Sequence, residues 1–202
     1  MHGLIYRTLQ LFVQDSHGAE SWRAIVDQAE LEVPEFEAML SYDPALAEGL
    51  LAAAQQVLSV PRDMLLEDVG TYLVSHPNNE VLRRLLRFGG LDFADFLHSL
   101  EDLPDRARLA VPDLVLPDLE LHEEAQNQFV LGLSGGFPGF GNVMVGLLRA
   151  IADDYGALVL LDHLGSDGDM EQVKIALVDT RHSSGRDFAL GDRRIAVAGQ
   201  SS

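Results

Sequence analysis

The spacing of hydrophobic residues predicts helices throughout the first half of the chain. Leu9, Phe12 and Val13 belong to an apolar stripe that begins after Gly3, and Gly18 is a typical stop signal, so a helix is expected over residues 3–17. Similar stripes, bounded by capping residues, prolines or glycine pairs, predict further helices. These lie at about residues 22–29, 44–58, 61–75 and 78–88, with a short piece around Phe36 and Met39.

A seventh helix is expected over residues 91–103, and the residue that follows it is unusual. Phe96, Leu97 and Leu100 form its apolar face, and Pro104 stands four residues beyond Leu100. Since residues four apart share a face of a helix, position 104 is expected to point into the interior. A proline there is expected to end the helix.

The second half of the chain changes to the pattern of a small sheet. Short apolar runs predict strands at residues 119–121, 129–133, 158–161 and 173–178, with polar turns at 122–127 and 166–169. A long helix over about 143–156 lies between the second and third strands, after the glycine-rich loop 134–141. Helices followed by strands indicate an α+β fold with a mostly antiparallel four-stranded sheet and one inserted long helix.

The expected organisation is a single domain over residues 1–180, with a tail after it. Residues 1–103 form the helical half and residues 104–180 the sheet-containing half. Residues 181–202 are expected to be a C-terminal tail, in which 188–190 and 195–197 are marginal strand candidates.

Charge and composition exclude several classes of partner. The formal net charge is -18, which opposes binding to nucleic acid and to anionic lipid heads. No apolar run approaches the roughly 18 residues of a spanning helix, and the start of the chain does not read as a signal peptide, so a cytoplasmic protein is expected. The acidity itself is typical of a soluble surface or of an acidic docking face.

The candidate chemistry is sparse. The chain has no cysteine, which excludes disulfides and thiolate metal sites, and its seven histidines include no His-x-x-x-His pair, so no metal site is predicted. The loop at 134–141 lacks the Gly-x-Gly-x-x-Gly order and the Lys-Ser or Lys-Thr of phosphate-binding loops. No catalytic set of side chains stands out, and the chain is not expected to be an enzyme.

A series of short motifs resembles a known family. These motifs are Met-His-Gly at 1–3, Gly-Ala-Glu-Ser-Trp at 18–22, Tyr-Asp at 42–43, Leu-Ala-Ala-Ala at 51–54 and Phe-Leu at 96–97. Together with the element order, they resemble the heme nitric oxide and oxygen binding (H-NOX) family, especially the heme domain of soluble guanylate cyclase. The resemblance covers roughly residues 1 to 180.

The same resemblance implies that the residues that hold heme are absent. The family's iron-binding histidine falls on Pro104, and its Tyr-x-Ser-x-Arg motif, which holds the heme carboxylates, falls on Leu133, Gly135 and Phe137. Pro117 resembles a family proline that packs against the porphyrin. Proline has no lone pair for iron, and an apolar wall disfavours an unpaired carboxylate. These five positions are the predicted ligand pocket.

What the resemblance implies is a sensory or regulatory signalling domain without heme. It would act through a signalling partner, such as a histidine kinase, a cyclic-dinucleotide enzyme or a chemotaxis receptor, because the chain is expected to carry no output domain. A small apolar ligand would occupy the former heme pocket. Two alternatives stay open: a heme sensor that uses another ligand, for which His98 is the candidate, and a purely structural interaction module.

Overall fold

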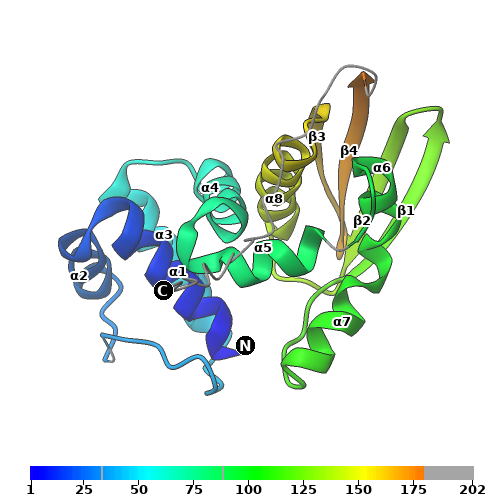
Figure 1. The fold of residues 1–202 in the computed structure, drawn as a ribbon. Helices are drawn as coiled ribbons and strands as arrows, with labels where there is room; N and C mark the ends of the chain where they lie inside the picture. The colour runs from blue at the N-terminus through cyan, green and yellow to red at the C-terminus, as the bar shows by residue number, and fades with distance from the viewer. Residues whose placement is uncertain (33, 88, 180–202) are drawn as a thin grey trace, which may run out of the picture.

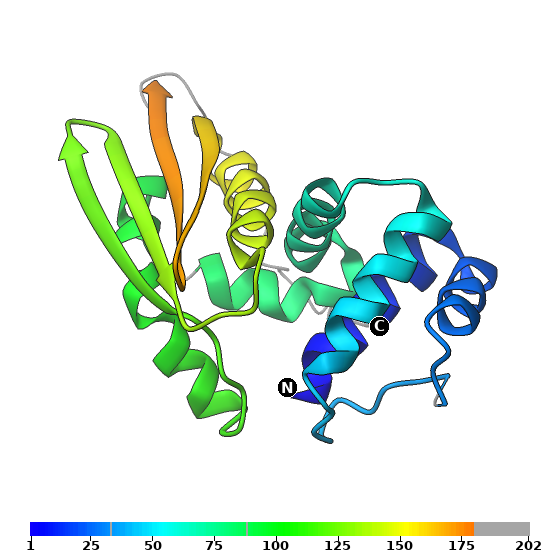
Figure 2. The ribbon, with the colours of Figure 1, turned by 180° about the vertical axis from the view of Figure 1, so that it is seen from behind.

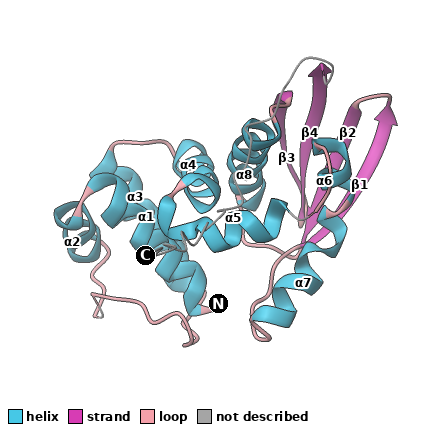
Figure 3. Cartoon of the chain, in the orientation of Figure 1, coloured by secondary structure: helices cyan, strands magenta, loops and turns pink. Residues whose placement is uncertain are grey.

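The structure is a computed structural model that describes residues 1–32, 34–87 and 89–179 (Figures 1 and 3). In this part of the chain, seven α-helices precede a four-stranded sheet. The helices are α1 (Gly3–His17), α2 (Ala19–Gln28), α3 (Ala45–Leu58), α4 (Arg62–Ser75), α5 (Glu80–Arg87), α6 (Phe93–His98) and α7 (Leu103–Ala110), with short 3-10 helices η1 (Pro77–Asn79) and η2 (Leu100–Asp102). The remaining elements are β1 (Asp118–Ala125), β2 (Gln128–Ser134), α8 (Phe140–Tyr155), β3 (Leu158–Asp167) and β4 (Met170–Asp179). The predicted α+β class is confirmed.

Helix α1 has the bounds that the sequence predicts. The His2 imidazole accepts the Leu4 backbone N–H at 3.2 Å, which satisfies one of the free N–H groups of the first turn. At the other end, Gly18 has φ 90°, a conformation that favours glycine and lets the chain turn directly into α2.

The short helix expected around Phe36 and Met39 is absent, since the described residues 34–43 consist of bends, turns and irregular backbone. Phe36 is buried, while the Met39 residue is 79% exposed. Side chains from α1 and α2 hold the segment instead of an internal helical turn: the Gln10 carbonyl oxygen accepts the Phe36 N–H at 2.9 Å, and the Trp22 indole N–H donates to the Pro34 carbonyl oxygen at 2.8 Å. Tertiary contacts therefore override the local apolar spacing.

The helix predicted over 91–103 is divided into α6, η2 and α7. The Ser99 N–H is shared between the carbonyl oxygens of Asp95 and Phe96, and the chain then tightens into a 3-10 turn. Pro104 is the second residue of α7, where a missing backbone N–H leaves no hydrogen bond unmade. The prediction that Pro104 ends a helix was wrong, because it helps to begin one; the prediction that it faces the interior is confirmed by its burial.

The sheet has the strand order β1-β2-β4-β3, and every pair of neighbours is antiparallel. The β1–β2 turn is shorter than predicted: the strands reach Ala125 and Gln128, and Asn127 takes φ 62° between them. One face of the sheet carries alternating buried residues, among them Leu131, Val173 and Ile175, which pack against α8 and α6.

The buried side chains form two cores. The first joins α1 to α4 around residues such as Trp22 and Leu50, and the second joins the sheet to α5, α6, η2 and α8 around Phe96 and Leu148. In Figures 1 and 2, α4 and α8 run side by side between the α1–α3 helices and the sheet. The boundary of the two cores thus follows α4, and α5 and α6 contribute side chains to the same core as the sheet although they precede it in sequence.

Glycines allow α4 and α8 to touch through their backbones. A Cβ atom on Gly146 would lie 1.9 Å from the Glu67 carbonyl oxygen, and one on Gly70 would lie 2.0 Å from the Val143 carbonyl oxygen. Both positions must remain glycine for the helices to keep this spacing.

The predicted tail at 181–202, including the strand candidates at 188–190 and 195–197, lies outside the described residues. Among the residues that the structure describes, no helix combines the length and the apolar composition needed to cross a bilayer.

Candidate functional site

An apolar cavity of about 260 Å³ lies between the two cores. One wall comes from α1, α3 and α4, and the other comes from α5, α7, α8 and the segments that precede β1 and α8. Its lining is dominated by aliphatic side chains and includes Leu4, Ile5, Leu50, Leu66, Val69, Leu82, Leu86, Leu103, Ala107, Leu114, Leu116, Leu119, Met144 and Leu147. Some of these residues, such as Leu50, Leu86 and Met144, belong to the apolar faces that the sequence predicts, but the lining residues lie on elements far apart along the chain.

Among the described residues of the lining, two side chains carry a hydroxyl, and both hydroxyls already donate to backbone. The Tyr6 hydroxyl donates to the Asp43 carbonyl oxygen at 2.7 Å, and the Thr8 hydroxyl donates to the Leu4 carbonyl oxygen at 2.8 Å. Burial, together with the charge of Asp43, raises the pKa of Tyr6 above its ordinary value. The phenol is therefore neutral at physiological pH, and no described side chain of the lining supplies a formal charge.

The cavity reaches the surface between the start of α1 and the segment around α7. Leu4 and Ile5 on one side, and Leu114 and Leu116 on the other, are only partly buried, whereas deeper lining residues such as Leu50 are inaccessible. Figure 2 shows the N-terminus of α1 facing the turn that follows α7. A ligand would enter between these two segments.

The structure brings together two of the five predicted pocket residues. Pro117, which is buried, and Phe137, which is half-buried, both line the cavity. Pro104 is buried without lining it, although its neighbour Leu103 does. Leu133 belongs to the sheet core, and Gly135 is exposed in the β2–α8 loop with φ 76°. The correspondence of these five positions to heme-binding positions stays a prediction.

His98, the candidate substitute heme ligand, lies outside the cavity lining. It is exposed at the C-terminal end of α6, and its ring packs edge-on against the Phe129 ring with centroids 5.8 Å apart. The two side chains thus form a contact between α6 and the sheet.

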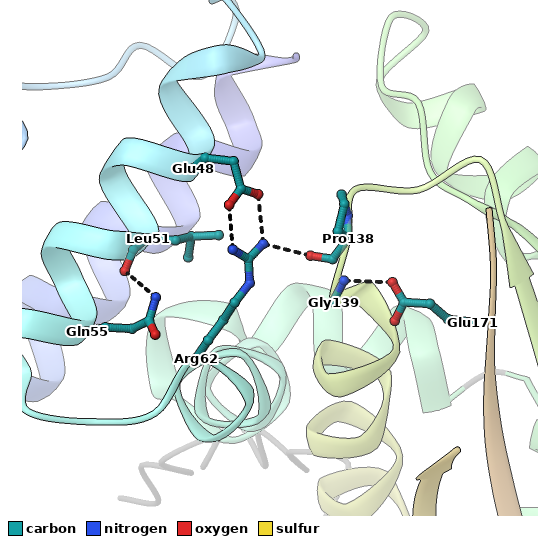
Figure 4. Close-up of polar contacts among 7 residues, drawn as sticks. All are labelled: Glu48, Leu51, Gln55, Arg62, Pro138, Gly139 and Glu171. Atoms are coloured by element: carbon teal, nitrogen blue, oxygen red, sulfur yellow. Dashed lines mark hydrogen bonds and ion pairs between the residues drawn. The ribbon is translucent and has the colours of Figure 1, made fainter. Parts of the chain in front are cut away.

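Arg62 and Glu171 hold the loop that carries Phe137 from two sides (Figure 4). The Arg62 guanidinium donates two hydrogen bonds to the Glu48 carboxylate, at 2.6 and 2.9 Å, and a third to the Pro138 carbonyl oxygen at 2.9 Å. The Glu171 carboxylate accepts the backbone N–H of Gly139 at 2.6 Å. Helix α4 and strand β4 therefore position one wall of the cavity together.

Glu171 also serves as an anionic cap for α8. Its second oxygen accepts the Gly141 N–H at 2.8 Å, and the His163 imidazole nitrogen Nε2 lies 3.0 Å from the same oxygen. A carboxylate at a helix N-terminus is stabilised by the free N–H groups and by the helix dipole. Sequence reasoning missed this residue, although it occupies an inward position of β4 in register with Val173 and Ile175. A charge on the buried face of a strand was the available signal.

The side chains of the described residues include no cluster of three His, Asp or Glu groups that would hold a metal ion. The polar network around Glu171 consists instead of one carboxylate, one imidazole and backbone N–H groups.

The comparison with family models identifies the class of the protein. The model described as Haem-NO-binding matches residues 2–163, which is most of the chain. The chain belongs to this family.

Curated relatives match over the same region. Soluble guanylate cyclase 89Db of Drosophila melanogaster is 22% identical over 155 residues, which cover 77% of this chain and 23% of the fly protein. Soluble guanylate cyclase gcy-31 of Caenorhabditis elegans is 23% identical over 154 residues, 76% of this chain and 22% of the worm protein. The chain thus spans less than a quarter of the length of these cyclases.

Solved structures confirm the fold. An H-NOX protein from S. oneidensis, in an Fe(II) state, has a TM-score of 0.74 at 18% identity and covers 89% of this chain and 97% of its own. The Fe(II) unliganded H-NOX protein from K. algicida has a TM-score of 0.73 at 21% identity, over 91% of this chain and 100% of its own. The predicted family and fold are therefore both confirmed.

The cavity lining does not fit the heme that the family name implies. Heme needs an axial ligand for iron and partners for two carboxylates. No histidine, arginine or lysine is among the residues that line the cavity in the described part of the chain. The other side chains there that could ligate iron are Tyr6, whose hydroxyl already donates to the Asp43 carbonyl oxygen, and the thioethers of Met1 and Met144. Arg62, at the edge of the loop that carries Phe137, is already paired with Glu48.

Proposed function

We propose that this chain is an H-NOX domain that has lost heme binding and acts as a sensory or regulatory module. It would work through a protein partner, with a small apolar ligand in the cavity between its two cores. The single observation that supports this proposal most directly is the lining itself, which combines open volume with an absence, among the described residues, of a histidine for iron and of cationic side chains for carboxylates.

The same observation distinguishes the proposal from its alternatives. A heme sensor based on His98 would need this exposed side chain to leave Phe129 and reach a cavity that it does not line. A purely structural module would be expected to fill the space between its cores, because interiors are ordinarily packed with few voids larger than a water molecule. A volume of about 260 Å³ favours a ligand instead.

The partner would be a signalling protein such as a histidine kinase, a cyclic-dinucleotide enzyme or a chemotaxis receptor. The family resemblance suggests this class, and the absence of a predicted catalytic set agrees with a role in regulation. The activity of a purified candidate kinase or cyclic-dinucleotide enzyme, measured with and without this domain, would test it.

Absorption spectra test the loss of heme. The protein is expressed with excess heme, passed through gel filtration and scanned for the intense porphyrin band, with the K. algicida H-NOX protein treated in parallel as a positive control. We expect the band in the control only. A stoichiometric band that stays with this chain through the column would overturn the proposal.

A further inference from the structure

The chemistry of the cavity restricts the charge of what it can hold. Its two hydroxyls already donate to the carbonyl oxygens of Asp43 and Leu4. The ammonium group of Met1, a residue that also lines the cavity, donates to the Tyr42 carbonyl oxygen at 2.7 Å. A charged ligand group would therefore lose its water without gaining a counter-charge from the lining side chains that the structure describes, and such a transfer is strongly unfavourable.

The charge of the whole chain opposes anions in the same way. With a formal net charge of -18, the surface repels carboxylates and phosphates before they reach the mouth. The cation beside the Phe137 loop, Arg62, is engaged by both oxygens of Glu48, so it does not offset this repulsion.

The volume restricts the size of the ligand. An apolar cavity of roughly 150 Å³ is sufficient for benzene. The cavity described above measures about 260 Å³, which is larger by more than half. A compact bicyclic hydrocarbon, with about ten to twelve carbon atoms, matches this volume better than a single ring does.

We propose that the cavity binds uncharged, compact hydrocarbon-like molecules of bicyclic size and rejects the same ring systems when they carry a carboxylate. This inference rests on the proposed function, since it names the ligand class of the proposed sensory cavity. It agrees with the proposed loss of heme binding, because the same rule that rejects a naphthoate would reject a porphyrin that carries two carboxylates.

A matched pair of probes tests the rule. Naphthalene and 2-naphthoate share one ring system and differ by a carboxylate, and their binding to the full chain is measured by calorimetry or by ring fluorescence. We expect naphthalene to bind and 2-naphthoate to bind about a hundredfold more weakly. Equal or tighter binding of 2-naphthoate would overturn the inference and leave the loss of heme untouched.

Variants that fill the cavity test whether naphthalene binds there. Ala107 lines the cavity from α7, and Ala110 is exposed on the same helix and does not line it. Ala107→Phe is expected to abolish naphthalene binding, and Ala110→Phe to leave it unchanged. If Ala107→Phe does not fold, Ala47→Phe fills the cavity from α3, with the exposed Ala45→Phe as its control. Binding that survives a folded cavity-filling variant places the probe elsewhere and refutes the proposal.

A variant that adds a cation at the mouth of the cavity tests whether the charge of the ligand, and not its shape, causes the rejection. Leu116, half-buried at the mouth, is replaced in Leu116→Arg by a guanidinium that can pair with a carboxylate. We expect the affinity of this variant for 2-naphthoate, taken relative to its affinity for naphthalene, to rise about tenfold over the same ratio in the wild type. No rise in a folded variant would contradict the role of charge. If wild-type protein binds neither probe, the inference fails, whereas the loss of heme fails only if the porphyrin band appears.

Discussion

The guanidinium of Arg62 donates a hydrogen bond of 2.9 Å to the carbonyl oxygen of Pro138, so that α4 is joined directly to the loop before α8. Phe137, the preceding residue, lines the cavity. The same guanidinium binds both oxygens of Glu48 on α3. One side chain thus connects two helices of the first core to the cavity wall on the far side.

Replacement of Arg62 should have a small but measurable effect. Arg62→Lys cannot bind Glu48 through two parallel N–H groups and reach Pro138 at once, so we expect a loss of up to about 1 kcal/mol in the free energy of unfolding in urea. Arg149→Lys is the matched control, because Arg149 makes a single 3.0 Å hydrogen bond to Glu67 and its side chain is 51% exposed. An equal loss in both variants would mean that the contact with Pro138 contributes nothing.

The ion pair of Arg62 and Glu48 should make the stability of the protein depend on pH in the acid range. The hydrogen bond from Arg62 lowers the pKa of Glu48 below its ordinary value of 4.5. Stability from the pair is therefore present above that value and is lost as pH falls through the lowered pKa. Glu48 is well exposed, so the difference between wild type and Glu48→Gln should be under about 1 kcal/mol at pH 7 and should be smaller at pH 3. Denaturant titrations at both pH values measure it; a constant difference would contradict the assignment.

Loss of the carboxylate at Glu171 should loosen the start of α8. Glu171→Gln retains one carbonyl oxygen for the two N–H groups of Gly139 and Gly141 and removes the charge, which should cost about 1–3 kcal/mol. Glu120→Gln, on the exposed face of β1, is the control and should be nearly neutral. Hydrogen exchange of the Gly139 and Gly141 amides should become faster in the first variant alone.

A methyl group at the contact of α4 and α8 should be strongly destabilising. In Gly146→Ala the new carbon would lie 1.9 Å from the backbone oxygen of Glu67, so the helices must separate, at a cost of about 3 kcal/mol. Gly49→Ala in α3 meets no atom within 4 Å and should stabilise the protein by up to about 1 kcal/mol. Urea unfolding of the two variants should therefore shift in opposite directions.

Tyr72 should contribute stability that alkali removes. Burial, and then the 2.7 Å hydrogen bond to the Asp15 carboxylate, raise the pKa of Tyr72 above its ordinary value of 10.0. Because the unfolded phenol ionises first, this contribution is complete below pH 10 and is lost as pH rises through the raised pKa. Tyr72→Phe should show a shallower fall in stability between pH 9 and 11. In the wild type, the tyrosinate absorption of Tyr72 should also appear only at a pH above the ordinary range of tyrosine. Ionisation of Tyr72 at an ordinary pH would refute the assignment.

Much of the fold could be predicted from the sequence because its signals are local. The stripe from Leu9 to Val13 and the glycine at 18 define α1, and the alternation in β4 defines the inner face of the sheet. The division of 91–103 into three elements could not be predicted, since Phe96, Leu97 and Leu100 keep one apolar face through the 3-10 turn. Periodicity alone does not distinguish the two conformations there.

The site was predictable only in part, because it is made where two cores meet. The resemblance to the family predicted Pro117 and Phe137 as pocket residues, and both line the cavity. Leu4 on α1 and Leu147 on α8 have no sequence signal that separates a residue lining a cavity from one in a packed core. That distinction depends on volumes between elements, which only the three-dimensional arrangement defines.

The backbone contact between α4 and α8 limits how the domain can respond to a ligand. Helices that meet through glycines have no flexible side chains between them to accommodate a movement of one helix relative to the other. Helices α4 and α8 should therefore move as one rigid unit in the middle of the molecule. Expansion of the cavity would then fall on its movable sides, α1 with α3 on one side and α7 on the other. A partner that senses occupancy would do so best by contacting those outer helices.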